Sequence, residues 1–174
     1  MRILGLDPGL AIVGYGVIDV PLNNAVSGHE DVRVIDYGII RTCTGVELSK
    51  RLQAIYEDTS SLLDELKPDL ISIEKLFFYR MGNTIAVAQA RGILLLCMGL
   101  RSLQHVEFSP PQVKLALTGD GRACKQEVQQ AVARNLQLTT LPRPDDAADG
   151  LALALTAWYD TPTRQSATCT ALSR

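Results

Sequence analysis

The sequence predicts a single α/β domain, with a five-stranded mixed sheet flanked by helices. Short apolar or β-branched runs alternate with longer segments in which apolar residues recur at helical spacing. No internal repeat divides the chain, and 174 residues are enough for one sizeable core. The hydrophobic content of 47% and charged content of 21% are ordinary for a globular protein, which excludes the disordered and fibrous classes.

The N-terminal part is predicted to form three antiparallel strands. Residues 3–6 form a short apolar run, and 12–20 and 32–42 have the β-branched and aromatic composition of strands. The polar stretch 21–31 joins the second strand to the third. Short links between neighbouring strands are typical of an antiparallel meander.

Helices alternate with two further strands in the rest of the chain. Apolar patterns predict strands at 69–76 and 105–108 and helices at 46–66, 84–103, 110–117, 125–136 and 147–159. Asp145 or Asp146 is the expected N-cap of the last helix. We expect a single domain over 1–160 and a loose Thr/Ser-rich tail over 161–174.

The helix predicted over 84–103 is apolar almost all round and rich in alanine and glycine. Such a helix is either buried within the chain or packed against a partner. The apolar run at 93–100 is too short to span a bilayer, so no membrane segment is expected.

The four cysteines stand far apart, without a CxxC pair or a nearby histidine. This spacing favours neither a zinc site nor a disulfide framework. Free thiols and the lack of a secretory signal pattern after Arg2 indicate a cytoplasmic protein.

The net charge of −2 hides a basic middle region. Residues 75–125 carry 7 basic and 2 acidic side chains, whereas residues 1–74 carry 6 basic and 12 acidic ones. A basic region on an acidic chain is either a polyanion-binding face or scattered solvated charge.

Two carboxylates follow buried strands directly. Asp7 lies after the first apolar run and before the strand-breaking Pro8–Gly9, and Glu74 ends the fourth strand. Each has a simple structural explanation, since Asp7 can cap the turn and Glu74 can face solvent. A charge at the edge of an apolar core is nevertheless costly unless it is paired, hydrogen-bonded or bound to a metal.

Two more carboxylates share one face of the last predicted helix. Asp146 and Asp149 are three residues apart in a first turn that is otherwise apolar and small. The helix macrodipole explains an acid at Asp146, but Asp149 lies deeper, next to Gly150. If the four acids converge, they form an all-oxygen site suited to Mg²⁺ or Mn²⁺. Two such ions can clamp the oxygens of a phosphoryl displacement.

The motifs together resemble the RuvC family of bacterial crossover junction (Holliday junction) endodeoxyribonucleases, within the ribonuclease H-like superfamily. The matching stretches follow family order: GLDPG at 5–9, GYGVI at 14–18, SIEKLFF at 72–78, Asn83, QARG at 89–92, QVK at 112–114, TGDGRACKQEV at 118–128 and DDAADGLALA at 145–154. They extend to about residue 158. The polar insertion near 22–31 and the segment after 160 depart from the family pattern.

The resemblance implies a structure-selective endonuclease that nicks two strands of a Holliday junction symmetrically in DNA recombination and repair. It implies that Asp7, Glu74, Asp146 and Asp149 are catalytic acids that bind two Mg²⁺ ions, with Mn²⁺ as a substitute. Lys114 and Lys125 match lysines near the scissile phosphate. The residues that it implies for DNA binding are Phe77, Arg80, Lys114, Arg122 and Lys125. Phe77 either stacks on unpaired bases of the junction or is a core residue.

The resemblance further implies a homodimer on four-way junction DNA, with the helix over 84–103 as a candidate interface, and the RuvA–RuvB branch-migration complex as a further candidate partner. Two other functions are compatible with parts of the sequence. An actin-like kinase shares the DxG turn but needs a second similar domain, for which the chain has no room. A non-catalytic junction-binding protein is expected to have lost an acid, and all four are present.

Overall fold

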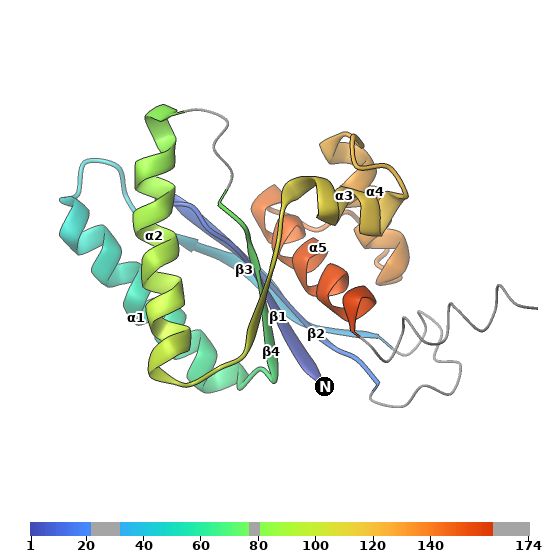
Figure 1. Ribbon diagram of the computed structural model, residues 1–174, viewed down its shortest axis with the longest axis horizontal. Coiled ribbons are helices and arrows are strands. Elements are labelled where there is room, and N and C mark those ends of the chain that lie inside the picture. The colour runs from blue at the N-terminus through green and yellow to red at the C-terminus, as the bar shows by residue number, and fades with distance from the viewer. Residues whose placement is uncertain (22–31, 77–80, 162–174) are drawn as a thin grey trace, which may run out of the picture.

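Five strands form one mixed sheet in the order β3-β2-β1-β4-β5 (Figure 1). The computed structural model describes residues 1–21, 32–76 and 81–161. The strands are β1 (Arg2–Asp7), β2 (Ile12–Asp19), β3 (Arg33–Arg41), β4 (Leu70–Glu74) and β5 (His105–Phe108). β1, β2 and β3 pair in antiparallel fashion, whereas β4 runs parallel to both β1 and β5. The predicted meander and mixed sheet are confirmed.

Helices cover both faces of the sheet (Figure 1). On one face lie α1 (Leu48–Leu66) and α2 (Met81–Leu100); on the other lie α3 (Pro110–Thr118), α4 (Lys125–Asn135) and α5 (Asp145–Asp160). Within the described ranges, none of these helices has both the length and the hydropathy to cross a membrane.

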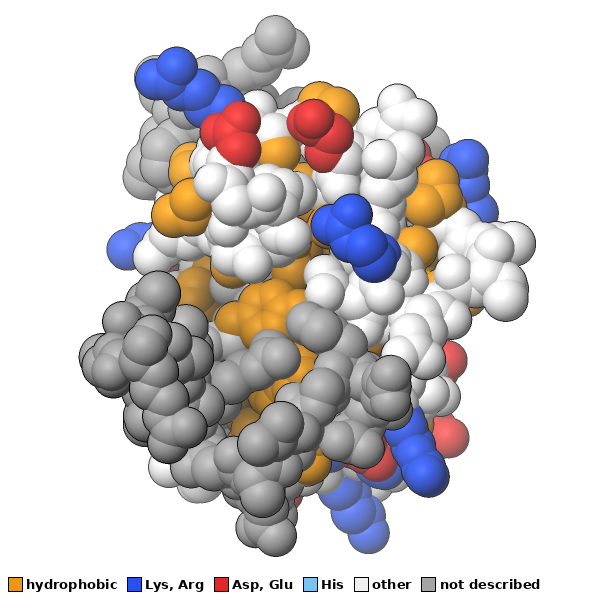
Figure 2. Space-filling view, turned by 90° about the vertical axis from the view of Figure 1, so that its right-hand side faces the viewer, with side chains coloured by type: hydrophobic (Ala, Val, Ile, Leu, Met, Phe, Trp, Pro, Cys, Tyr) orange, Lys and Arg blue, Asp and Glu red, His pale blue; other side chains and the backbone are white. Residues whose placement is uncertain are grey.

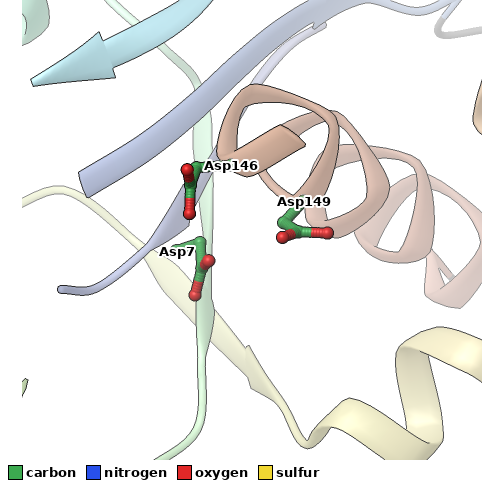
Figure 3. A group of neighbouring side chains, drawn as sticks. All are labelled: Asp7, Asp146 and Asp149. Atoms are coloured by element: carbon green, nitrogen blue, oxygen red, sulfur yellow. The ribbon is translucent and has the colours of Figure 1, made fainter. Parts of the chain in front are cut away.

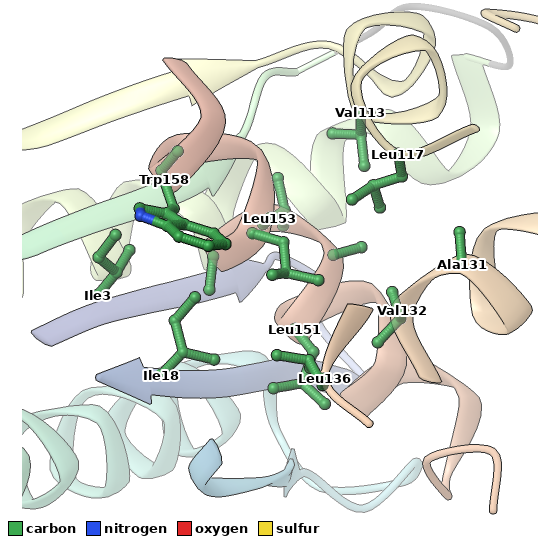
Figure 4. Close-up of a cluster of buried hydrophobic side chains, with 14 of the residues drawn as sticks. Ile3, Ile18, Val113, Leu117, Ala131, Val132, Leu136, Leu151, Leu153 and Trp158 are labelled. Atoms are coloured by element: carbon green, nitrogen blue, oxygen red, sulfur yellow. The ribbon is translucent and has the colours of Figure 1, made fainter. Parts of the chain in front are cut away.

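Successive side chains of β1 point to opposite faces of the sheet, and each face has its own hydrophobic core. Leu4 and Leu6 pack in the core under α1 and α2, while Ile3 packs with Leu151 and Trp158 of α5 (Figure 4). Asp7 lies an even number of residues after Ile3, so its side chain points to the same face of the sheet, the face covered by α5. The strand therefore places one carboxylate beside the start of that helix.

Helix α5 lies against β1 and β2 through a glycine contact formed by Gly5, Gly14, Gly16 and Gly150. A Cβ on Gly5 would lie 1.9 Å from the carbonyl oxygen of Gly150, and one on Gly150 would lie 2.4 Å from the backbone carbon of Tyr15. Glycine within a strand is typical of close approach by another backbone. Gly5 of β1 and Gly150 of α5 therefore approach each other closely.

Several predicted boundaries differ from those observed. The N-cap of α5 is Pro144, so the prediction of Asp145 or Asp146 at that position is wrong. Asp145 is the first helical residue, and its carboxylate bonds to Arg143 instead of capping the helix. Helix α2 ends at Leu100, before a turn in which Ser102 has a φ of 53°. Strand β4 is shorter than predicted, and stops at Glu74.

Burial of α2 within the protein is one-sided. Ala90, Leu94 and Met98 are fully buried, whereas Ile85, Leu96 and Leu100 are 70%, 49% and 62% exposed. The core of this chain therefore covers only part of the apolar surface of α2.

Candidate active site

Three aspartates meet where β1 ends and α5 begins. Asp7 is the last residue of β1, and Asp146 and Asp149 lie in the first turns of α5. Each offers one carboxylate oxygen, and the three oxygens all lie within 4.8 Å of one another (Figure 3). The structure thus brings together three of the four acids singled out from the sequence.

The backbone of β2 allows α5 to bring its aspartates this close. Gly14 lies opposite Asp7 in the β1–β2 register, and a Cβ on Gly14 would come within 2.0 Å of the carbonyl oxygen of Asp146. The spacing of three residues then places Asp149 on the same side of α5 as Asp146. Any larger residue at Gly14 would push the helix, and both of its carboxylates, away from Asp7.

Glu74 adjoins this group from the neighbouring parallel strand. Leu6 pairs with Ile73, so Asp7 and Glu74 come next at the ends of β1 and β4. Glu74 lines one pocket together with Asp149, Lys114 and Lys125. It is the fourth acid at the same end of the sheet, although it is not one of the three whose oxygens lie within 4.8 Å.

The acids raise one another's pKa values. The pKa of Asp7 lies well above its usual value because the carboxyl is buried and because Glu74, Asp149 and Asp146 surround it with negative charge. Burial and the charge of Asp149 raise the pKa of Glu74 to about 7. Burial also raises the pKa of Asp149, and its bond to Lys125 offsets only part of that rise. Without a cation the site therefore favours protonated carboxyl groups.

The donor set fits a hard divalent cation. All of its ligand atoms are carboxylate oxygens, which Mg²⁺ and Mn²⁺ prefer over softer sites. A bound cation would lower the carboxyl pKa values and remove the mutual repulsion of the acids. The site is thus suited to metal binding, and the side chains themselves do not choose between Mg²⁺ and Mn²⁺.

Two lysines lie at the border of the acidic group. Lys125, the first residue of α4, donates a hydrogen bond from Nζ to Asp149 Oδ2 at 2.9 Å. Burial acts to lower the pKa of this ammonium, but the bond to Asp149 and the negative charges of the neighbouring aspartates together outweigh it, so the pKa is raised and the group stays charged. Lys114 of α3 lines the same pocket. The structure therefore places both predicted lysines beside the acids.

The remaining predicted residues lie elsewhere. Arg122 is exposed, in the turn before α4, where its backbone N–H donates to Asp120 at 2.8 Å. Phe77 and Arg80 lie outside the described residues, so their predicted contacts with DNA remain predictions.

Figure 2 shows the side of the molecule that lies at the right of Figure 1. On its described part, basic and acidic side chains are scattered among uncharged ones and do not form one basic patch. The basic middle region of the sequence is thus not concentrated on this side.

Sequence reasoning missed two contributions to the site. The pocket has an apolar wall that includes Pro110, Val113 and Val128. Arg91 of α2 donates a hydrogen bond from Nε to the backbone oxygen of Glu74 at 3.2 Å. Arg91 stands in the QARG stretch, which was the available signal, but nothing in the sequence shows which residue it contacts.

Comparison with known proteins identifies the family. The family model described as crossover junction endodeoxyribonuclease RuvC matches residues 3–157. The protein of that name from Gloeobacter violaceus is 60% identical over 159 residues, which cover 91% of this chain and 88% of the relative. Its namesake from Synechococcus sp. (strain CC9311) is 54% identical, over 91% of this chain and 99% of the relative.

Solved structures agree in fold. Thermus thermophilus RuvC in complex with a Holliday junction substrate aligns with a TM-score of 0.83 and 32% identity, over 95% of this chain and 96% of that one. The yeast mitochondrial Holliday junction resolvase Ydc2 aligns with a TM-score of 0.59 at 14% identity, a likeness of fold alone. With the family match over nearly all of the described core, this chain belongs to the RuvC family of crossover junction endodeoxyribonucleases.

Proposed function

We propose that this endonuclease resolves Holliday junctions with two Mg²⁺ ions held by Asp7, Glu74, Asp146 and Asp149. The observation that carries the proposal is the group of three aspartate oxygens within 4.8 Å of one another, with Glu74 at the adjacent strand end. Four acids in one partly buried site are tolerated when divalent cations balance their charge. When bound, the ions supply Lewis-acid activation of water and of the scissile phosphodiester.

The protein residues hold and orient the reacting groups. Asp7 lies closest to the negative charge of the other three acids, so it would be a central ligand of the bound cations. Lys125 is charged and bonded to Asp149, and Lys114 lies in the same pocket. Both ammonium groups are placed to attract the scissile phosphate and to stabilise negative charge on it.

Further DNA contacts are assigned to Arg122 beside α4 and to Phe77 and Arg80 after β4. The exposure of Arg122, three residues before Lys125, supports a backbone phosphate contact. For Phe77 and Arg80 the support is their place in the family motif, next to Glu74 in the chain.

Symmetric nicking of two strands requires two active sites, and we assign the dimer contact to the exposed face of α2. Ile85, Leu96 and Leu100 expose apolar surface there. Gly92 and Gly99 lie between them, and a Cβ on either would meet nothing within 4 Å, which leaves room for a partner helix. Sedimentation equilibrium of the full chain measures this directly; a monomer at cleavage concentrations would contradict it.

The wider setting follows from the family. The RuvA–RuvB branch-migration complex is the partner that would deliver the junction. The described cysteines Cys43, Cys97 and Cys124 are free, which supports a reducing, cytoplasmic location. The core clusters of the described residues are formed by elements from β1 to α5, which supports one nuclease domain over 1–160, and a tail over 161–174 stays a prediction.

Substitution of single acids by their amides tests the proposed site. Asp7→Asn and Glu74→Gln should abolish cleavage of a synthetic four-way junction in Mg²⁺, because each removes a ligand charge while preserving shape. Junction binding, measured by fluorescence anisotropy in Ca²⁺, should be kept. The matched control is Asp145→Asn, since Asp145 neighbours the site on α5 but bonds to Arg143 at 3.1 Å.

Full cleavage by Asp7→Asn or Glu74→Gln would overturn the assignment of the acids. A wild-type protein that binds junctions but cuts none under any divalent metal would instead favour the non-catalytic junction-binding alternative.

A further inference from the structure

We infer that Arg91 is a positioning residue that holds Glu74 in place for metal binding, acting from the opposite face of the sheet. The inference rests on the proposed function, because it takes Glu74 as a metal ligand. Arg91 belongs to α2, which lies on the α1 side, whereas the acids gather on the α5 side.

Two hydrogen bonds fix the guanidinium of Arg91 between β4 and β5. Its Nε donates to the backbone oxygen of Glu74 at 3.2 Å, and its Nη2 donates to the carboxylate of Glu107 in a short ion pair. The Arg91 side chain is only 14% exposed, so its guanidinium is largely shielded from solvent, whereas Glu107 is 33% exposed. A planar guanidinium bonded at two nitrogens has a defined orientation.

Alternation along β4 explains why Arg91 contacts the backbone of Glu74 and not its carboxylate. Ile73 packs in the core beneath α1 and α2 and pairs with Glu107, so Glu107 faces the same side as Arg91. The Glu74 side chain points to the other face, where it lines the pocket with Asp149 and Lys125. Arg91 thus fixes the peptide from which the catalytic side chain projects.

The need for this contact comes from the position of Glu74 at a strand end. β4 stops at Glu74, and one residue further the Lys75 N–H donates to the backbone oxygen of Phe108 at 2.8 Å. Described residues 75 and 76 have no regular structure. Metal ligation depends on carboxylate placement, and outer groups that orient a ligand typically affect metal affinity or activity about 10–100-fold.

The experiment measures metal binding and cleavage together. Mn²⁺ binding to the full-length protein without DNA is followed by isothermal titration calorimetry, and junction cleavage is measured across a Mg²⁺ titration. For Arg91→Gln we expect the Mn²⁺ Kd and the half-saturating Mg²⁺ concentration both to rise about tenfold. Junction affinity in Ca²⁺-free buffer with EDTA should stay within twofold of wild type, roughly the assay's resolution.

Two further variants keep the test decisive if Arg91→Gln does not fold. Arg91→Lys retains a cation near Glu107 but cannot bond both partners from two nitrogens, so a smaller rise is expected. Glu107→Gln leaves Arg91 in place and removes its ionic partner at a one-third-exposed position, and should raise the same two constants less than Arg91→Gln. If neither variant changes metal affinity, the inference is wrong.

The matched control is Arg101→Gln. Arg101 comes directly after the last residue of α2, ten residues further along the chain than Arg91, and bonds through two nitrogens to Asp64, at 2.8 and 3.0 Å. It should leave both metal constants unchanged; an equal rise would show that any loosening of α2 has the same effect, which overturns a specific role for Arg91.

The result for Glu74→Gln separates the two hypotheses. If Glu74→Gln binds Mn²⁺ and cleaves as wild type does, the proposed ligand set fails. If Glu74→Gln is inactive while Arg91→Gln keeps wild-type metal constants, the proposed function stands and only the inference about Arg91 is lost.

Discussion

The two faces of the sheet are packed by different means. Under α1 and α2, large aliphatic side chains such as Leu6, Ile71 and Ile73 separate the helices from the strands. Under the start of α5, glycines bring helix and strand backbones into direct contact. The clustered aspartates lie on this second face, because short aspartate side chains on a strand and on a helix meet only where the two backbones are close.

This contrast also explains where charge is buried. On the α1/α2 side the ion pair of Arg101 with Asp64 lies at the surface. On the α5 side the acids are partly buried beside one another, with raised pKa values for Asp7, Glu74 and Asp149. One face therefore stabilises the fold, while the other carries an electrostatic cost in the absence of metal.

The largest expected effect comes from adding a methyl group to the glycine contact. In Gly150→Ala the new Cβ would lie 2.4 Å from the Tyr15 backbone, so α5 must move away from β2. We expect a loss of about 3 kcal/mol in the free energy of unfolding, with loss of cleavage as Asp146 and Asp149 move. Urea denaturation and the junction assay measure both.

Gly92→Ala on α2 is the matched control for Gly150→Ala. It adds the same methyl group to a helix where nothing in the same chain lies within 4 Å, and it is compared on dilute, monomeric protein because Gly92 lies on the face assigned to the dimer contact. Here the gain in helix propensity should raise the free energy of unfolding by about 0.5–1 kcal/mol. If both variants changed stability alike, close backbone contact would not distinguish the two faces.

A smaller effect is expected from pH in the metal-free protein. The pKa of Glu74 rises from its usual value of 4.5 to about 7 in the fold, so between these values the folded state binds more protons than the unfolded state. The free energy of unfolding should therefore fall as pH rises from about 4.5 to 7, on the order of 2 kcal/mol. Thermal melts in EDTA across this range measure the slope.

Saturating Mg²⁺ should flatten that slope, because cation binding favours the ionised carboxylates. It should also raise the melting temperature at pH 8 for wild type and much less for Asp7→Asn. A metal-free protein whose stability rose over the same pH interval would contradict the burial of like-charged acids.

The sequence alone predicted the strand order of the meander and the positions of the acids at strand and helix ends, for identifiable reasons. Pro8 and Gly9 stop β1 after Asp7, and the three-residue spacing puts Asp146 and Asp149 on one helix face. These are local patterns. The pairing of Gly14 with the Asp146 backbone and of Arg91 with Glu74 depends on which helix covers which face, and one sequence does not carry that information.

The prediction of the α5 N-cap was wrong for a related reason. Asp145 and Asp146 have the right chemistry to cap a helix, but here one bonds to Arg143 and the other faces the acidic group. Local propensity was overridden by the function of the site.

Removing one ion pair on each face should have the smallest effect on stability and should distinguish the two faces most clearly. Lys125→Gln removes the 2.9 Å bond to Asp149, and Arg101→Gln removes the bonds to Asp64. Both cations are near the surface, so each variant should change the melting temperature little. Only Lys125→Gln should slow junction cleavage, by about 100-fold, since it removes the charge that the proposed function assigns to the scissile phosphate.

The metal dependence then distinguishes two roles for Lys125. Asp149 without its lysine is a freer ligand, so Mn²⁺ affinity measured by calorimetry should hold or tighten while the cleavage rate falls. A parallel loss of metal affinity would mean that Lys125 serves to orient Asp149, and full-rate cleavage would remove the lysine from the reaction. Because Arg101→Gln alters a comparable pair on the other face, any slowing it shares with Lys125→Gln must be assigned to the fold and not to the site.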